Sequence, residues 1–358
     1  MRAARYYDQK DIRIDDIDAP EAQSGQVLID VAWCGICGSD LHEYLEGPLS
    51  IPPAGHPHPI SGEEAPVTIG HEMSGTVAAL GDGVTDLEIG QQVVVEPYVI
   101  EEKYKNTANY NLSPNMGFIG LVGRGGGLAE QIAVDRHWVH PISDDVPLDQ
   151  AAMIEPLSVA HHAYVNSQAQ SGDIALIGGA GPIGVLTTAV LKAEGITTIV
   201  SEPSDLRRNR AEESGVADYV LDPRNDDVVE EALKITDGRG VDVGFECSSV
   251  PVVLDTLIEA VRPAGTIVNV SVWSSKPEVN MPKLVLKEIK LAGVIGYCND
   301  HKDTIDLVES GKIDLKPFIT GKIGLDDLID KGFDALINHN ESAIKILVSP
   351  SGQGLDEV

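Results

Sequence analysis

The chain has 358 residues and a formal net charge of −30 at pH 7, with 56 acidic against 26 basic side chains. This length exceeds one ordinary hydrophobic core and predicts two domains. The charge argues against nucleic acid and anionic membranes as partners, because both would repel the chain. The acidic residues are dispersed, which favours a halophilic source, since high salt screens self-repulsion. An ordinary acidic cytosolic enzyme is the alternative.

The cysteine content and the N-terminus indicate the compartment. Four cysteines in a chain of this size do not make a disulfide framework. The first eight residues lack the apolar core of a signal peptide, and no run approaches the roughly 18 apolar residues of a membrane span. We therefore expect a protein of the reducing cytoplasm.

The first third of the chain reads as short strands separated by turns. Apolar and polar residues alternate in the predicted strands, which are 26–32, 75–80 and 92–96. Proline, glycine and histidine predict a loop over 50–66, and the glycine run 123–127 predicts another. This part is expected to be mainly β.

The pattern changes near residue 151. A helix is predicted over 148–169, followed by strand 173–178, helix 183–194, strand 198–201 and helix 206–214, with further buried strands at 243–247, 266–270 and 291–295. This alternation predicts an α/β fold with a doubly wound parallel sheet. The predicted domains are 1–156 with 297–358, and 157–296.

Two short motifs in the first domain carry metal-binding residues. Cys37 and His71 lie in Cys37-Gly-Ser-Asp-Leu-His42 and Gly70-His71-Glu72. A thiolate, an imidazole and a carboxylate are ligands that Zn²⁺ accepts. Neighbours on a strand point to opposite sides, which disfavours Glu72 beside His71 as the third ligand. Glu155 lies where the first domain joins the second and offers another carboxylate.

A glycine turn opens the second domain. Residues 179–184 match G-x-G-x-x-G after an apolar strand and before a helix, the context in which this motif binds a dinucleotide. Glu202 ends the next strand, where a carboxylate accepts ribose hydroxyls and repels a 2′-phosphate, so NAD is favoured over NADP. Arg207 and Arg208 nearby could instead hold a phosphate. The expected cofactor contacts are Gly179, Gly181, Pro182, Ile183, Gly184, Glu202 and Arg207.

In this order the motifs resemble those of zinc-containing medium-chain alcohol dehydrogenases, over essentially the whole chain. The resemblance implies a GroES-like, mainly β catalytic domain interrupted by a Rossmann domain. It also implies roles for seven side chains. Cys37, His71 and Glu155 would be zinc ligands, Glu72 a nearby carboxylate that can approach the metal, Asp40 the group that orients His71, and Ser39 and His42 a proton relay.

Three further stretches, 33–44, 116–121 and 344–348, are similar to the 2,3-butanediol dehydrogenase (acetoin reductase) branch, near the sorbitol dehydrogenases. The resemblance implies that a secondary alcohol or vicinal diol and its ketone are interconverted with NAD(H), with 2,3-butanediol and acetoin as the first choice. A polyol or sugar dehydrogenase, sorbitol- or threonine-dehydrogenase-like, is the alternative. A non-catalytic NAD-binding relative is a more distant one. A homodimer or homotetramer is implied, with the strand near 291–296 at the interface.

One departure from the family concerns a second, structural zinc. Many members hold it with four closely spaced cysteines, but residues 97–130 contain none here. We therefore expect one catalytic zinc per subunit and a lobe held by packing or by subunit contacts. Cys34 is expected to be a buried thiol rather than a ligand. His161 and His162 are expected to be packing or surface groups.

Overall fold

The computed structural model describes residues 1–339 and 343–355, and it divides into two compact units. The first comprises Met1–Glu155, His301–Glu309 and, from Ile319, the C-terminal part, and the second comprises Pro156–Asp300 with Ser310–Phe318. The sequence predicted one continuous return segment from residue 297. In the structure this return begins at His301, and residues 310–318 lie with the second unit.

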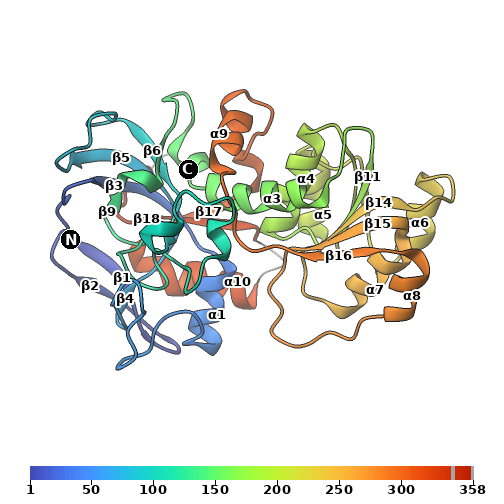
Figure 1. Cartoon of the computed structure of the whole chain (residues 1–358), viewed down its shortest axis with the longest axis horizontal. Helices are drawn as coiled ribbons and strands as arrows, with labels where there is room; N and C mark the ends of the chain where they lie inside the picture. Colours follow the sequence, from blue (N-terminus) through green and yellow to red (C-terminus); the bar gives the residue numbers. More distant parts are fainter. Residues whose placement is uncertain (340–342, 356–358) are drawn as a thin grey trace. The chain divides into compact units, whose positions relative to one another are not determined.

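The first unit is built mainly from strands (Figure 1). Its largest sheet has the order β10-β6-β5-β3-β18-β17, with β9 also paired to β3. The strands are β1 (Arg2–Asp8), β2 (Asp11–Asp16), β3 (Gln26–Gly35), β4 (Val67–Thr68), β5 (Glu72–Leu80), β6 (Gln92–Val95), β7 (Tyr98–Val99), β8 (Gly117–Phe118), β9 (Gln131–Asp135), β10 (Val139–Pro141), β17 (Ile319–Gly324) and β18 (Lys345–Ser349). Its helices are α1 (Gly38–Glu46), α2 (Leu148–Ala151), α9 (His301–Glu309) and α10 (Asp334–Asn338).

Strand β3 organises this unit. Its alternating pattern buries Val27, Ile29 and Val31, as the sequence predicted for a half-buried strand. At its last residue, Gly35, the strand is paired with Glu72 of β5 on one side and with Leu347 of β18 on the other. The end of β3 therefore brings together segments that are far apart in the chain.

The lobe without cysteines is held by aromatic packing. The rings of Tyr98, Tyr110 and Trp138 contact one another in pairs, with centroids 5.3 to 5.7 Å apart. The hydroxyl of Tyr110 donates a hydrogen bond to the buried carboxylate of Glu96, which also bonds Nε2 of His140 at 2.9 Å. These ring contacts and the hydrogen-bonded carboxylate of Glu96 pack this segment against its surroundings.

The second unit is a six-stranded, all-parallel sheet flanked by helices, with the order β13-β12-β11-β14-β15-β16 (Figure 1). The strands are β11 (Ile174–Gly178), β12 (Thr197–Ser201), β13 (Tyr219–Leu221), β14 (Val241–Glu246), β15 (Val261–Asn269) and β16 (Lys290–Gly293). The helices are α3 (Ile154–Ser167, which begins in the first unit), α4 (Pro182–Ala193), α5 (Asp205–Glu213), α6 (Val228–Ile235), α7 (Pro251–Ala260) and α8 (Met281–Lys287). The order reverses between β11 and β14, which is the Rossmann topology that the sequence predicted.

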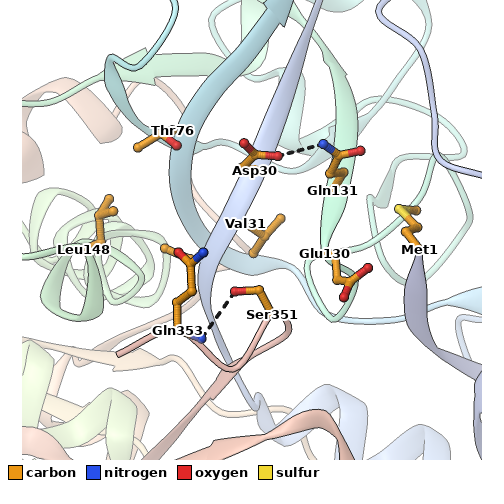
Figure 2. A pocket seen from close by; sticks show the side chains of 10 residues that line it. Met1, Asp30, Val31, Thr76, Glu130, Gln131, Leu148, Ser351 and Gln353 are labelled. Carbon is orange, nitrogen blue, oxygen red and sulfur yellow. Dashed lines mark hydrogen bonds between the residues drawn. The ribbon is translucent and has the colours of Figure 1, made fainter. Parts of the chain in front are cut away.

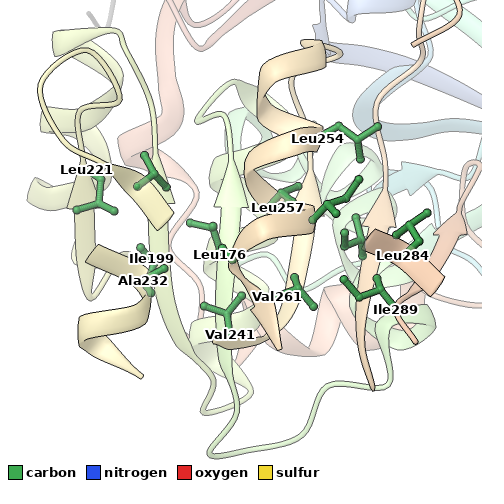
Figure 3. Close-up of a cluster of buried hydrophobic side chains, with 14 residues drawn as sticks. Leu176, Ile199, Leu221, Ala232, Val241, Leu254, Leu257, Val261, Leu284 and Ile289 are labelled. Carbon is green, nitrogen blue, oxygen red and sulfur yellow. The ribbon is translucent and has the colours of Figure 1, made fainter. Parts of the chain in front are cut away.

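The core of this unit lies between the sheet and one layer of helices (Figure 3). Leu176, Val241 and Ile267 come from three adjacent strands, and Leu254 and Leu257 from α7 pack on them. These side chains are aliphatic and almost fully buried, in line with an aromatic content of only 4%.

The single helix predicted over 148–169 is wrong. The structure has two helices, α2 and α3, separated at residues 152–153. Pro156 explains the break, because a continuous helix would need its missing N–H and would press its ring on the carbonyl of residue 152. Pro156 instead lies in the first turn of α3, directly after Glu155.

No helix in the described part of the chain has both the length and the apolar character required to cross a membrane.

Candidate functional site

The first unit contains a cluster of metal-ligating side chains. Cys37, His71 and Glu72 each offer one ligand atom, and these atoms lie within 4.8 Å of one another. His71 and Glu72 are buried and Cys37 is half-buried. A thiol, an imidazole and a carboxylate at this spacing match the donor set of a zinc site.

Helix α1 positions the surroundings of His71. Asp40, in its first turn, is buried and accepts the N–H of Cys37 at 2.9 Å, which fixes the start of the helix. Its other oxygen lies 3.7 Å from Nδ1 of His71, an electrostatic contact rather than a hydrogen bond. Ser39 Oγ lies 3.2 Å from Nε2 of the same ring.

The charges around His71 outweigh the effect of burying it. Burial lowers the pKa of His71, but Asp40, Cys37 and Glu155 raise it, and the balance holds it well above the ordinary value for histidine. Nearby acidic groups favour a positive charge on the ring, which is the reason for the raised pKa. Burial also raises the pKa of Asp40, against the lowering effect of His71.

Glu72 is close to His71, although the rule for neighbours on a strand disfavoured this. The rule does not apply because β5 begins at Glu72, and His71 precedes the strand. The carboxylate of Glu72 lies over Gly35 of β3, where an added Cβ would be 2.0 Å from Oε2 of Glu72. The absence of a side chain at position 35 makes room for this carboxylate beside the cluster.

Lys345 is a residue of this cluster that the sequence did not predict. It is 2% exposed, and its ammonium donates to both carboxylate oxygens of Glu72, at 2.7 and 2.6 Å, and to the carbonyl of Ile36 at 3.1 Å. Burial lowers the pKa of Lys345, but the charges of Glu72 and Cys37 raise it above its usual value. A lysine within the apolar strand 344–348 was the available signal, because lysine is rarely buried without a partner.

Glu155, the predicted third ligand, is buried in the first turn of α3 and belongs to the first unit. Its charge raises the pKa of both His71 and Lys345, so it lies in the same electrostatic environment. Two carboxylates, from Glu72 and Glu155, thus accompany the thiol and the imidazole.

The residues of the predicted relay differ in exposure. Ser39 is half-buried and contacts His71, whereas His42, three positions later on α1, is exposed. Positions i and i+3 share one face of a helix. Cys34 is fully buried, and burial raises the pKa of its thiol well above the usual value, which suits a packing role.

The glycine turn of the second unit has the predicted form. Gly179 has φ +98°, which favours glycine, and a Cβ on Gly184 would be 1.9 Å from the carbonyl oxygen of Gly179. Helix α4 begins at Pro182 and continues through Ile183. In front of Gly181, the nearest group to an added Cβ is Nη1 of Arg207, at 4.0 Å. The start of a helix at such a glycine turn is a place where a phosphate can bind.

Glu202 follows β12, next to this turn, and is buried. Its carboxylate accepts the N–H groups of Ala180 at 2.7 Å and Ser204 at 2.8 Å. The guanidinium of Arg208 is bound to the carbonyls of Glu202 and Pro203 and to Asp205. Arg207, rather than Arg208, is thus the arginine beside the turn.

The first unit also has a polar cavity of about 380 Å³ among Met1, Asp30, Glu130, Gln131 and Ser351 (Figure 2). Its lining includes none of the metal-type side chains described above. Asp30 is hydrogen-bonded to Gln131 at 2.7 Å inside it. The cavity is therefore a different place from the cluster of Cys37 and His71.

Two family models match the chain. The model of the alcohol dehydrogenase GroES-like domain matches residues 23–144, and the model of the zinc-binding dehydrogenase matches residues 182–310. The first contains Cys37, His71 and Glu72, and the second begins within the glycine turn.

Similar proteins extend over the full length. The chain is 62% identical to the (R,R)-butanediol dehydrogenase of Neisseria gonorrhoeae over 98% of this chain and 100% of that protein. It is 45% identical to the enzyme of the same name from Bacillus subtilis, again over 98% and 100%. The crystal structure of 2R,3R-butanediol dehydrogenase from Bacillus subtilis superposes with a TM-score of 0.92 at 44% identity, covering 98% of this chain and 99% of that one.

Proposed function

Because the chain belongs to the zinc-binding alcohol dehydrogenase family, we propose that it interconverts 2,3-butanediol and acetoin with NAD(H). The chain is an oxidoreductase of the alcohol dehydrogenase class. The substrate is supported by the identity of 62% to an (R,R)-butanediol dehydrogenase over nearly the whole chain. The chemistry is supported by the thiol, imidazole and carboxylate of Cys37, His71 and Glu72 within 4.8 Å.

The thiol, the imidazole and a carboxylate fit a zinc ion, and the ligand atoms that lie within 4.8 Å of one another are those of Cys37, His71 and Glu72. The family resemblance assigns the carboxylate ligand to Glu155, whose charge acts on His71, and leaves Glu72 as the nearby carboxylate. Nδ1 of His71 faces Asp40, which leaves Nε2 as the nitrogen for the metal and lets Asp40 orient the ring. Lys345 balances the charge of Glu72. When bound, zinc lowers the pKa of a hydroxyl and polarises a carbonyl, and the nicotinamide carries the hydride.

Ser39 and His42 are proposed to move the proton that an alcohol releases. The Ser39 hydroxyl both accepts and donates hydrogen bonds, and its oxygen lies 3.2 Å from Nε2 of His71, so it borders the position proposed for the metal. His42 lies on the same helix and is exposed, so its ring is in contact with solvent. Ser39 is thus a half-buried proton acceptor near the metal ligands, and His42 is an exposed one farther along the helix.

NAD is proposed as the cofactor rather than NADP. The buried carboxylate of Glu202 is bound to the Ala180 amide of the glycine turn, and a 2′-phosphate there would meet a like charge. A lower KM for NADP than for NAD would contradict this role of Glu202.

A substrate panel tests the function. With NAD, we expect turnover of (R,R)-2,3-butanediol and little of sorbitol or threonine, and turnover of acetoin with NADH. Preference for sorbitol would support the polyol alternative, and cofactor binding without turnover of any alcohol would support a non-catalytic relative. His71→Ala should lose zinc and turnover but keep its affinity for NAD.

An exposed edge of the parallel sheet supports the proposal that the chain associates with copies of itself. Strand β16 is an edge of the parallel sheet, and Leu291 on it and Val285 and Leu286 on α8 are 43%, 70% and 83% exposed. Burial of such an edge in a homodimer, or in a homotetramer built from it, satisfies both the strand and the apolar side chains. Leu291→Lys should disrupt this interface and lower the mass measured by light scattering.

The dispersed acidic charge of the chain supports the proposal that it works in a cytoplasm rich in salt.

A further inference from the structure

Glu246 is a fully buried carboxylate at the carboxyl end of the parallel sheet. It is the last residue of β14 and has an exposed fraction of 0%. In the sheet it pairs with Gly178 of β11 on one side and with Asn269 of β15 on the other. It thus lies where the strand order reverses. Its partner Gly178, on the neighbouring strand, directly precedes the glycine turn.

The carboxylate ties together the loops that follow β14 and β15. Oε1 accepts the N–H groups of Ser248 at 2.9 Å and Ser249 at 3.0 Å, and the Ser248 hydroxyl at 2.5 Å. Oε2 accepts the hydroxyl of Ser271. The backbone carbonyl of Glu246 also accepts the N–H of Val270 at 3.0 Å.

Further hydrogen bonds join the same two loops. The Ser249 hydroxyl donates to the carbonyl of Val272 at 3.0 Å. Asn269 donates to the carbonyl of Ser271 at 2.8 Å and accepts from the indole of Trp273 at 2.7 Å. Residues 247–250 and 270–273 therefore form one connected platform centred on Glu246.

The contacts of Glu246 are all with neutral groups. Among the described residues, no lysine, arginine or histidine nitrogen lies within 4.0 Å of its carboxylate. A buried charge without a cation contributes little to stability, since an apolar side chain of similar volume would avoid the cost of desolvation. The length and the hydrogen bonds of this side chain are therefore better explained by the two loops that it joins.

The sheet topology indicates which part of a bound dinucleotide lies next to this platform. A dinucleotide binds at the carboxyl ends of the strands, with its pyrophosphate at the N-terminus of α4 and its adenosine on the Glu202 side. Its other half then extends over β14 and β15. Resting on the proposed use of NAD, we propose that Glu246 is a positioning residue that holds residues 247–250 and 270–273 to receive the nicotinamide half.

Calorimetry with NAD and with ADP-ribose, which lacks the nicotinamide ring, tests this. Glu246→Asp keeps the charge but is one methylene too short to hold both loops. We expect its Kd for NAD to rise about tenfold, the value of a charge-assisted hydrogen bond, and its Kd for ADP-ribose to stay within about twofold. Glu246→Gln keeps the length, and the Ser271 hydroxyl can turn to accept from its amide, so this variant should retain most of the affinity for NAD.

Ser271→Ala is the milder variant if Glu246→Asp does not fold, and it should show the same selective loss for NAD. Ser214→Ala, which removes a hydroxyl bound to the Ala211 carbonyl on α5, is the matched control. Equal losses for both ligands, or none for NAD in Glu246→Asp and Ser271→Ala, would overturn the inference. Failure of the wild-type protein to bind either ligand would instead overturn the proposed function.

Discussion

The ammonium of Lys345 holds both carboxylate oxygens of Glu72, at 2.7 and 2.6 Å, although the two residues are 273 positions apart. Both are almost fully buried, and Gly35 between their strands leaves the space in which they meet. The pair connects the C-terminal strand β18 to the cluster of Cys37 and His71. Its charges are compensated only while both partners are present.

Lys345→Met should therefore lower the free energy of unfolding by roughly 3–5 kcal/mol, because it leaves a buried carboxylate without its cation. Urea denaturation monitored by circular dichroism measures this. The double variant Lys345→Met, Glu72→Met should recover much of the loss, since a buried pair replaced by apolar groups is nearly neutral. Lys331→Met, at an exposed pair with Asp327, is the control and should change stability by less than about 1 kcal/mol. No rescue in the double variant would argue against the coupling.

The lobe of Tyr98, Tyr110 and Trp138 should be independent of metal. Elemental analysis should find one zinc per chain, and a chelator that removes it should leave the near-ultraviolet dichroism of these rings unchanged. Two tightly held zinc ions per chain would contradict this prediction.

Tyr110→Phe should lower the free energy of unfolding by about 1–3 kcal/mol, because the buried Glu96 loses a donor. Tyr219→Phe removes a hydroxyl from a residue that is 45% exposed, and it should have almost no effect. A chemical denaturation series on the two variants and the wild type makes the comparison. Equal stability of all three would show that the Tyr110 hydroxyl does not staple the lobe.

Asp300 should contribute a pH-dependent part of stability in the second unit. Burial raises its pKa, but hydrogen bonds with Nδ1 of His161 at 2.6 Å and of His162 at 2.9 Å lower it from 3.8 to about 2. A depressed pKa stabilises the folded state above pH 4, and the contribution is lost as pH falls through about 2.

The stability difference between wild type and Asp300→Asn should therefore shrink by about 2 kcal/mol between pH 5 and pH 2. Urea melts at several pH values measure it, with Asp303→Asn as the control that should give parallel curves. A difference that is constant with pH would show that the two histidines do not depress the pKa of Asp300. His161 and His162, expected as packing or surface groups, are thus partners of a buried carboxylate.

Salt should stabilise the protein because its net charge is −30. Raising NaCl from about 0.1 M to 1 M shortens the screening length from roughly 10 to 3 Å and weakens self-repulsion. The melting temperature and the activity after desalting should both fall at low salt and recover on addition of salt. Sucrose at equal osmolality is the control for a general solute effect. A melting curve that does not change with salt would remove the halophilic interpretation.

Local patterns in the sequence determined much of this protein. The alternation of apolar strands with helices predicted the parallel sheet, since a strand or helix pattern depends on neighbours within a few residues. The glycine turn and the motifs around Cys37 and His71 were recognisable for the same reason. The break at residues 152–153 was also open to prediction, because Pro156 alone requires it.

Tertiary structure alone decided how distant segments combine. The alternation of side chains along a strand predicted that Glu72 and His71 point to opposite sides. However, β5 begins only at Glu72, and the Glu72 carboxylate lies over Gly35. The apolar strand around Lys345 indicated that a buried lysine needs a partner, but not which residue it is, because Glu72 comes from a strand that meets β18 through the end of β3. A buried charge is set by the groups that surround it in space, and sequence spacing does not contain that information.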